Sequence, residues 1–130
     1  MTPTEHIKTA REFLDASDKE FEAGDELQAS EKLWGAATHA LRAAMQVEGR
    51  TGGKHHELRE AAQRLADERN DPTIQSGFAI AEKFHANFYH GFMEDFQIES
   101  DRPLVHDFVD RILFDRPPMV TEFPPPGGES

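Results

Sequence analysis

The sequence predicts an all-α fold, an up-and-down bundle of four to five helices. Apolar residues recur at spacings of three and four over most of the chain, which is the period of an amphipathic helix. Three prolines, Pro3, Pro72 and Pro103, stand at or near the start of such segments, where a missing backbone N–H is tolerated. No stretch alternates apolar and polar residues long enough to indicate a strand. A helical bundle with short loops satisfies all three observations.

The individual helices follow from this periodicity and from the residues that interrupt it. We expect helices at about residues 3–23, 25–48, 54–68, 72–96 and 103–114. Gly24 stops the first helix, and Asp25 caps the second. The second helix is rich in alanine and apolar over more than half of its circumference, so we expect it to be the central helix of the bundle.

The later helices carry the aromatic residues. The fourth predicted helix has a stripe of apolar residues at Phe78, Ala81, Phe84, Phe88 and Phe92. This pattern predicts a buried face, because aromatic side chains remove a large area from water. We expect the bundle to occupy residues 1–115. Residues 116–130 are rich in proline and glycine and are predicted to form a flexible tail.

Composition restricts the possible functions. The formal net charge is −11, from 25 acidic and 14 basic residues, which disfavours general affinity for nucleic acid. The absence of cysteine excludes disulfides, thiolate nucleophiles and cysteine-ligated zinc. No apolar run approaches the roughly 20 residues of a membrane span, and the N-terminal residues lack the basic-then-apolar order of a signal peptide. We therefore expect a cytoplasmic protein that uses neither a membrane nor a cofactor.

The segment Arg50-Thr-Gly-Gly-Lys-His-His-Glu-Leu-Arg59 is the first candidate site. Arg50 with His55 or His56 could supply the cation and the near-neutral base that metal-independent RNA cleavage needs. Lys54 and Arg59 could extend this group into a small basic patch that binds a ligand. The competing interpretation is a glycine-loosened turn with solvated cations at a helix start.

Glu82-x-x-His85 is the second candidate. A glutamate and a histidine three residues apart project together from a helix, which is the spacing of ferritin-like di-iron sites. Those sites need the motif twice, and this chain has it once, so Glu82 and His85 are weak metal candidates. His85 is in register with the aromatic stripe, which favours a core histidine hydrogen-bonded to a neighbouring helix.

The aromatic residues of the second and fourth helices are the third candidate. Trp34 with Phe84, Phe88, Tyr89 and Phe92 could form a pocket on which a nucleobase stacks, while Asn87 reads its edge. A packed core is the simpler explanation of such a stripe. Asn87 and Tyr89 lie beside the stripe, so we expect them to face solvent or an interface and to be available to a ligand.

Three segments in this order resemble the HEPN superfamily (higher eukaryotes and prokaryotes nucleotide-binding). They are the alanine-rich run SEKLWGAATHALRAAMQ, the Gly-then-His-x-Leu turn, and the string AEKFHANFYHGF. The similarity covers roughly residues 10–96 and is greatest to the short, single-domain archaeal repeat-family branch. It implies a helical bundle, often dimeric, and for many members a nucleotidyltransferase-like protein partner.

Active HEPN ribonucleases carry an Arg-x4–6-His motif near the start of the later long helix. In this sequence neither His85 nor His90 follows an arginine at that distance. Arg50-x4-His55 and Arg50-x5-His56 have that spacing, but they lie one helix earlier. The resemblance therefore implies the fold and favours a non-catalytic binding or interaction module, for a nucleotide, a nucleic-acid end or a protein partner. The alternatives are a toxin-like endoribonuclease and a metal-binding bundle, and we expect a homodimer in each case.

Overall fold

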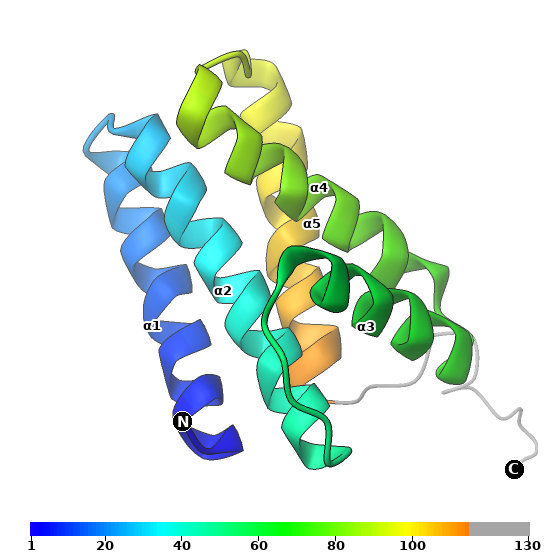
Figure 1. The fold of residues 1–130 in the computed structure, drawn as a ribbon. Coiled ribbons are helices and arrows are strands. Elements are labelled where there is room, and N and C mark those ends of the chain that lie inside the picture. Colours follow the sequence, from blue (N-terminus) through cyan, green and yellow to red (C-terminus); the bar gives the residue numbers. More distant parts are fainter. Residues whose placement is uncertain (115–130) are drawn as a thin grey trace, which may run out of the picture.

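The computed structural model describes residues 1–114, and these residues form five α-helices and no strand (Figure 1). The helices are α1 (Pro3–Glu22), α2 (Glu26–Val47), α3 (His55–Glu68), α4 (Pro72–His90) and α5 (Asp95–Phe114). The predicted all-α bundle is confirmed. The predicted tail, residues 116–130, lies outside the described residues.

Side-chain caps define most of the helix starts. Thr2 and Glu5 form a reciprocal capping box at α1, and Asp25 accepts a hydrogen bond from the Gln28 amide at α2. Asp71 accepts from the Thr73 amide at α4. At α3 the Glu57 carboxylate accepts from the amides of Gly53 and Lys54. These bonds satisfy amides that lack a partner within the helix.

Helix α2 is the centre of the bundle, as its broad apolar surface predicts. It contacts each of the other four helices. Figure 1 shows α1 running antiparallel beside it, with α5 and α4 on its other side and the shorter α3 against α4. The fully buried side chains Leu33 and Leu41 of α2 pack in one core with Phe84 of α4 and Phe108 of α5.

The end of α4 and the start of α5 differ from the prediction. Helix α4 ends at His90, not near residue 96, because Gly91 adopts a left-handed conformation (φ +59°) and closes the helix. Phe92 therefore lies beyond the helix and is half exposed, so its predicted place in the buried stripe is wrong. Asn87 fixes the turn, since its side-chain carbonyl accepts a hydrogen bond from the Met93 amide at 2.8 Å.

Helix α5 begins at Asp95, eight residues before its predicted start at Pro103. The Gln97 side chain accepts a hydrogen bond from the Glu94 amide, which caps the new first turn. Pro103 lies inside the helix on its exposed side. The helix continues through this proline because buried residues anchor it on both sides, Ile98 before and Val105 after.

Candidate functional site

Two histidines meet on the indole of Trp34 where α2, α3 and α4 come together. The ring centroid of His85, on α4, lies 4.8 Å from that of Trp34 in a stacked arrangement. His55, the first residue of α3, lies 5.1 Å from the indole, and the two imidazole centroids are 6.1 Å apart. Trp34 itself is buried, whereas both imidazoles reach the surface.

Each imidazole is held by a carboxylate from another helix. His55 Nε2 lies 2.6 Å from Glu82 Oε2, and Arg59 donates to the same oxygen at 2.8 Å. His85 Nδ1 lies 2.8 Å from Glu31 Oε1. A carboxylate beside one ring nitrogen fixes the orientation of the imidazole and requires a proton on that nitrogen. The opposite nitrogen of each ring can then accept or donate a hydrogen bond.

Helical periodicity brings these side chains to one place. Glu31 and Trp34 are three residues apart on α2, and His55 and Arg59 are four apart on α3. Glu82, His85 and Tyr89 follow one another at spacings of three and four on α4, which puts them on one face. Three short sequence patterns therefore combine into one site only when the helices pack.

The surface of this cluster is an aromatic ledge made by His55, His85 and Tyr89, with Arg59 at its edge. Tyr89 lies 5.3 Å from His85, edge to face, and is 65% exposed. The ledge offers ring faces for stacking, ring N–H groups and one guanidinium, with two carboxylates as acceptors. A flat heteroaromatic ligand with amino groups and a single anionic group has the matching chemistry.

Five of the predicted site residues lie in this cluster: His55, Arg59, Glu82, His85 and Tyr89. The predicted hydrogen bond of His85 to a neighbouring helix is confirmed by its contact with Glu31 of α2. Its predicted place in the core is wrong, because its side chain is 27% exposed. Glu82 and His85, proposed together from their spacing, instead face different partners. Across residues 1–114 no group of three His, Asp or Glu side chains has an arrangement that could hold a metal ion.

The other predicted residues lie apart from the ledge. Arg50 pairs with Glu48 at 3.7 Å and lines a separate hollow with Glu57 and Arg64, so it does not join His55. Lys54 and His56 are exposed at the start of α3. The expectation that Asn87 faces solvent is wrong. Its side chain is buried, donating to Ser30 Oγ at 3.0 Å and accepting from Met93.

Glu31 is the residue that sequence analysis missed. A single partly exposed glutamate in a helix has no distinctive local pattern, and its partner lies 54 residues away. The one available signal was its position three residues before the single tryptophan, on the same face of α2.

A second pair of histidines lies elsewhere, between α1 and α2. His6 is nearly fully buried, and its Nδ1 lies 2.8 Å from Nδ1 of His39, whose ring also stacks on Phe13. Burial, and then the positive charge of Arg42, lower the pKa of His39 to about 4. Burial likewise lowers the pKa of His6. This pair is neutral at physiological pH and is enclosed by the bundle.

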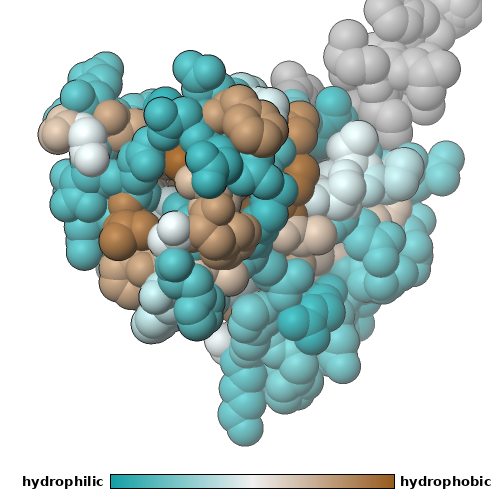
Figure 2. All heavy atoms as spheres, turned by 90° about the horizontal axis from the view of Figure 1, so that it is seen from above, coloured by the Kyte–Doolittle hydropathy of each residue, from teal (hydrophilic) through white to brown (hydrophobic). Residues whose placement is uncertain are grey.

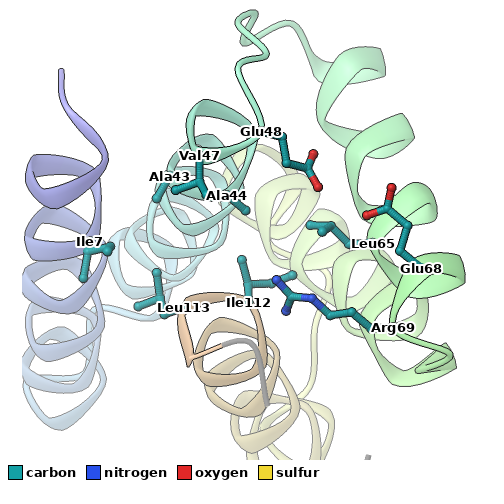
Figure 3. Close-up of a pocket in the computed structure, with 10 residues that line it drawn as sticks. All are labelled: Ile7, Ala43, Ala44, Val47, Glu48, Leu65, Glu68, Arg69, Ile112 and Leu113. Atoms are coloured by element: carbon teal, nitrogen blue, oxygen red, sulfur yellow. The ribbon is translucent and has the colours of Figure 1, made fainter. Parts of the chain in front are cut away.

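The most enclosed of the surface hollows described is distinct from both histidine pairs. It has a volume of about 320 Å³ and lies between α1, α2, α3 and α5 (Figure 3). Its wall is mostly apolar, including Ile7, Leu65 and Ile112, with Glu48, Glu68 and Arg69 on one side. None of its lining residues belongs to the ledge. No helix within residues 1–114 has the length and apolarity to cross a membrane.

A family model supplies the identification that the geometry alone does not. The model of the archaeal PaREP1/PaREP8 family matches residues 5–109, which covers α1 to α4 and most of α5. The chain belongs to the archaeal PaREP1/PaREP8 family. Neither the curated proteins nor the solved structures gave a significant match to it. The match to the PaREP1/PaREP8 family includes every residue of the ledge.

Proposed function

We propose that this PaREP1/PaREP8 protein is a non-catalytic, HEPN-like binding module that holds a nucleotide, or the end of a nucleic-acid strand, on the ledge. One observation carries the proposal: two imidazoles lie against a single indole, and each is oriented by a carboxylate from a different helix. Side chains fixed in this way lose little conformational freedom when a ligand binds.

The ligand class follows from the groups at the ledge. A nucleobase can stack on Tyr89 or on an imidazole, and its exocyclic amino groups can donate to a carboxylate. Arg59 is 59% exposed at its side chain and can turn toward a phosphate. The net charge of −11 opposes long polyanions, so a mononucleotide or a strand end fits better than a duplex.

The fluorescence of Trp34 provides a direct test, because Trp34 is the single tryptophan of the chain. Titration with the four ribonucleoside monophosphates is expected to change its emission and to saturate. Tyr89→Ala and Arg59→Ala are expected to weaken the binding at least about tenfold, or roughly 1.4 kcal/mol. Phe96→Ala, which removes an equally exposed aromatic ring outside the ledge, serves as the matched control.

Either of two results would overturn this function. The first is an unchanged emission spectrum with all four nucleotides up to millimolar concentration. The second is binding that Phe96→Ala weakens as much as Tyr89→Ala does. Circular dichroism of each variant separates loss of binding from loss of the fold.

The distance between the two imidazoles supports a second candidate, a metal-independent endoribonuclease. In such a reaction one histidine removes the proton of a ribose 2′-OH, which attacks the adjacent phosphorus. The other histidine protonates the 5′-oxygen as the P–O5′ bond breaks, leaving a cyclic phosphate and a free 5′-hydroxyl. Centroids 6.1 Å apart allow His55 and His85 to reach opposite sides of one phosphate. Arg50 and His56 have no part in this version.

Cleavage of a mixed-sequence RNA in the presence of EDTA tests this candidate. His55→Ala and His85→Ala are each expected to abolish cleavage, whereas His56→Ala and Arg50→Ala are expected to retain it. Cleavage that survives both ledge substitutions would point to a contaminating nuclease. A wild-type protein that binds nucleotides and leaves RNA intact would favour the binding module.

The HEPN-like part of the proposal rests on the order of the alanine-rich α2, the His-x-Leu turn and the histidine-bearing α4. It carries with it the expectation of a homodimer and of a nucleotidyltransferase-like partner. Light scattering coupled to size exclusion measures the first directly, and a mass of one 14.7 kDa chain across the micromolar range would exclude it.

A further inference from the structure

The end of the bundle where the α1–α2 turn meets the α4–α5 turn differs from the rest of the surface. We name this region, residues 22–28 and 91–97, the acidic end. The two turns are in contact, since Leu27 lies beside Gly91 and residues of both turns line one hollow of about 290 Å³. Figure 2 looks onto this end and shows apolar residues standing between hydrophilic ones.

The acidic end exposes large apolar side chains. Phe96 is 71% exposed, Phe92 46% and Leu27 43%. Given the size of such side chains, this amounts to an exposed apolar area on the order of 300 Å². Patches of this size on a monomer often have a function. The area is well below the ~800 Å² that each partner of a standard interface contributes, so it suits a short segment better than a second folded domain.

The same end carries only negative charge. Its two segments contain five acidic residues and neither lysine nor arginine. Burial, then a hydrogen bond between the carboxyl groups of Glu26 and Asp95, and then the negative charge of Asp95 raise the pKa of Glu26. Neither carboxylate is paired with a cation among the ion pairs of residues 1–114. A positive group between them would relieve this repulsion.

The opposite end of the bundle differs in its charged residues, because it contains arginines as well as acids. It carries Arg42, Arg50, Arg64 and Arg69, and most of its acids are in ion pairs or helix caps. At the acidic end, by contrast, carboxylates without a cationic partner among residues 1–114 lie in the same two segments as the exposed rings of Phe92 and Phe96. Phenylalanine faces also attract guanidinium and ammonium groups.

We propose that the acidic end is a docking surface for a short, basic amphipathic helix of a partner protein. The apolar face of that helix packs on Phe92 and Phe96. Its lysine or arginine side chains pair with Glu26 and Asp95, which gives the partner its charge complementarity. The surface shares no residue with Trp34, His55 or His85, so it is independent of the ligand proposed for the ledge.

Fluorescence anisotropy with a labelled helical peptide of leucine and lysine tests this proposal. We expect the wild type to bind the peptide in the micromolar range. Phe96→Ser, and separately the double variant Glu26→Gln/Asp95→Asn, are expected to weaken binding at least about tenfold. Phe114→Ser removes an exposed phenylalanine at the far end of α5 and is expected to change affinity less than about twofold.

A control peptide with glutamate at each lysine position is expected not to bind. Three outcomes overturn the proposal: no binding of the basic peptide up to millimolar concentration, equal binding of the acidic peptide, or equal losses in Phe96→Ser and Phe114→Ser. Light scattering of the same variants adds a fourth. If Phe96→Ser abolishes a self-association of the wild type and leaves peptide binding intact, the surface joins two copies of this chain instead.

Discussion

The two histidine pairs of this protein have opposite surroundings. His6 and His39 share a hydrogen bond inside the α1–α2 interface, with burial and a cationic neighbour. His55 and His85 lie at the surface of α3 and α4, each against a carboxylate. One pair is enclosed and kept neutral, and the other is oriented and accessible.

This difference teaches that the partner and the burial of a histidine, and not its presence, decide its role. At 2.8 Å, one Nδ1 of the buried pair must donate and the other must accept, so protonation of both rings breaks the contact. In the carboxylate-bound pair each imidazole faces a carboxylate oxygen, so neither ring has to act as the acceptor of its contact. The buried pair therefore contributes to stability, whereas the exposed pair is accessible to the ligand that we propose for the ledge.

The largest expected effect concerns the response of the buried pair to acid. The pKa of His39 falls from 6.5 in the unfolded chain to about 4 in the fold. Between pH 6.5 and pH 4 the unfolded chain binds a proton at His39 that the native chain does not bind. The contribution of neutral His39 to the free energy of unfolding is therefore complete above pH 6.5 and is lost as the pH falls toward 4. After allowance for the partial exposure of His39, the loss is roughly 1–3 kcal/mol.

Urea unfolding of the wild type and of His39→Gln at pH 7.0 and 4.5 measures this loss. The difference in free energy of unfolding between the two pH values is expected to shrink in His39→Gln. His90→Gln, at the exposed end of α4, is the matched control and is expected to retain the wild-type difference. The interpretation fails if both variants behave alike.

The next effect tests the cation beside the buried pair. Arg42 lowers the pKa of both His39 and His6 through its charge. Arg42→Gln is expected to raise the pKa of both histidines, as measured by NMR titration of the imidazole protons. Arg50→Gln, in the loop before α3, is expected to leave both values unchanged. If Arg42→Gln leaves both pKa values unchanged, the low pKa values of His6 and His39 do not depend on the charge of Arg42.

The smallest effect is expected at the exposed pair. Glu82→Gln and Glu31→Gln remove carboxylates from partly exposed ion pairs, which contribute little to stability. Each substitution is expected to change the free energy of unfolding by less than about 1 kcal/mol. Thermal and urea unfolding at pH 7 check this. A loss above about 3 kcal/mol in either variant would show that the ledge is part of the stabilising core and would remove the contrast between the pairs.

Sequence periodicity was sufficient for most of the fold. The breadth of α2, the cap at Asp25 and the prolines Pro3 and Pro72 are local signals, and the helix starts that depended on them are where they were predicted. The boundary between α4 and α5 differs from the prediction because Gly91 ends a helix and Pro103 does not begin one. A left-handed glycine ended one helix, and burial on both sides carried the next helix through a proline.

The sequence alone determined that this chain is an all-α bundle with a central, alanine-rich helix, because local periodicity and capping act over a few residues. It also supplied His55, Arg59, Glu82, His85 and Tyr89 as candidates. Tertiary structure decided which of them act together, because partners such as Glu31 and His85 lie 54 residues apart and meet only through helix packing. Tertiary structure also buries Asn87, which holds the α4–α5 turn through the Met93 amide, and it places His6 against His39 as a neutral pair. Burial could not be read from the local sequence, because it is a property of the whole bundle.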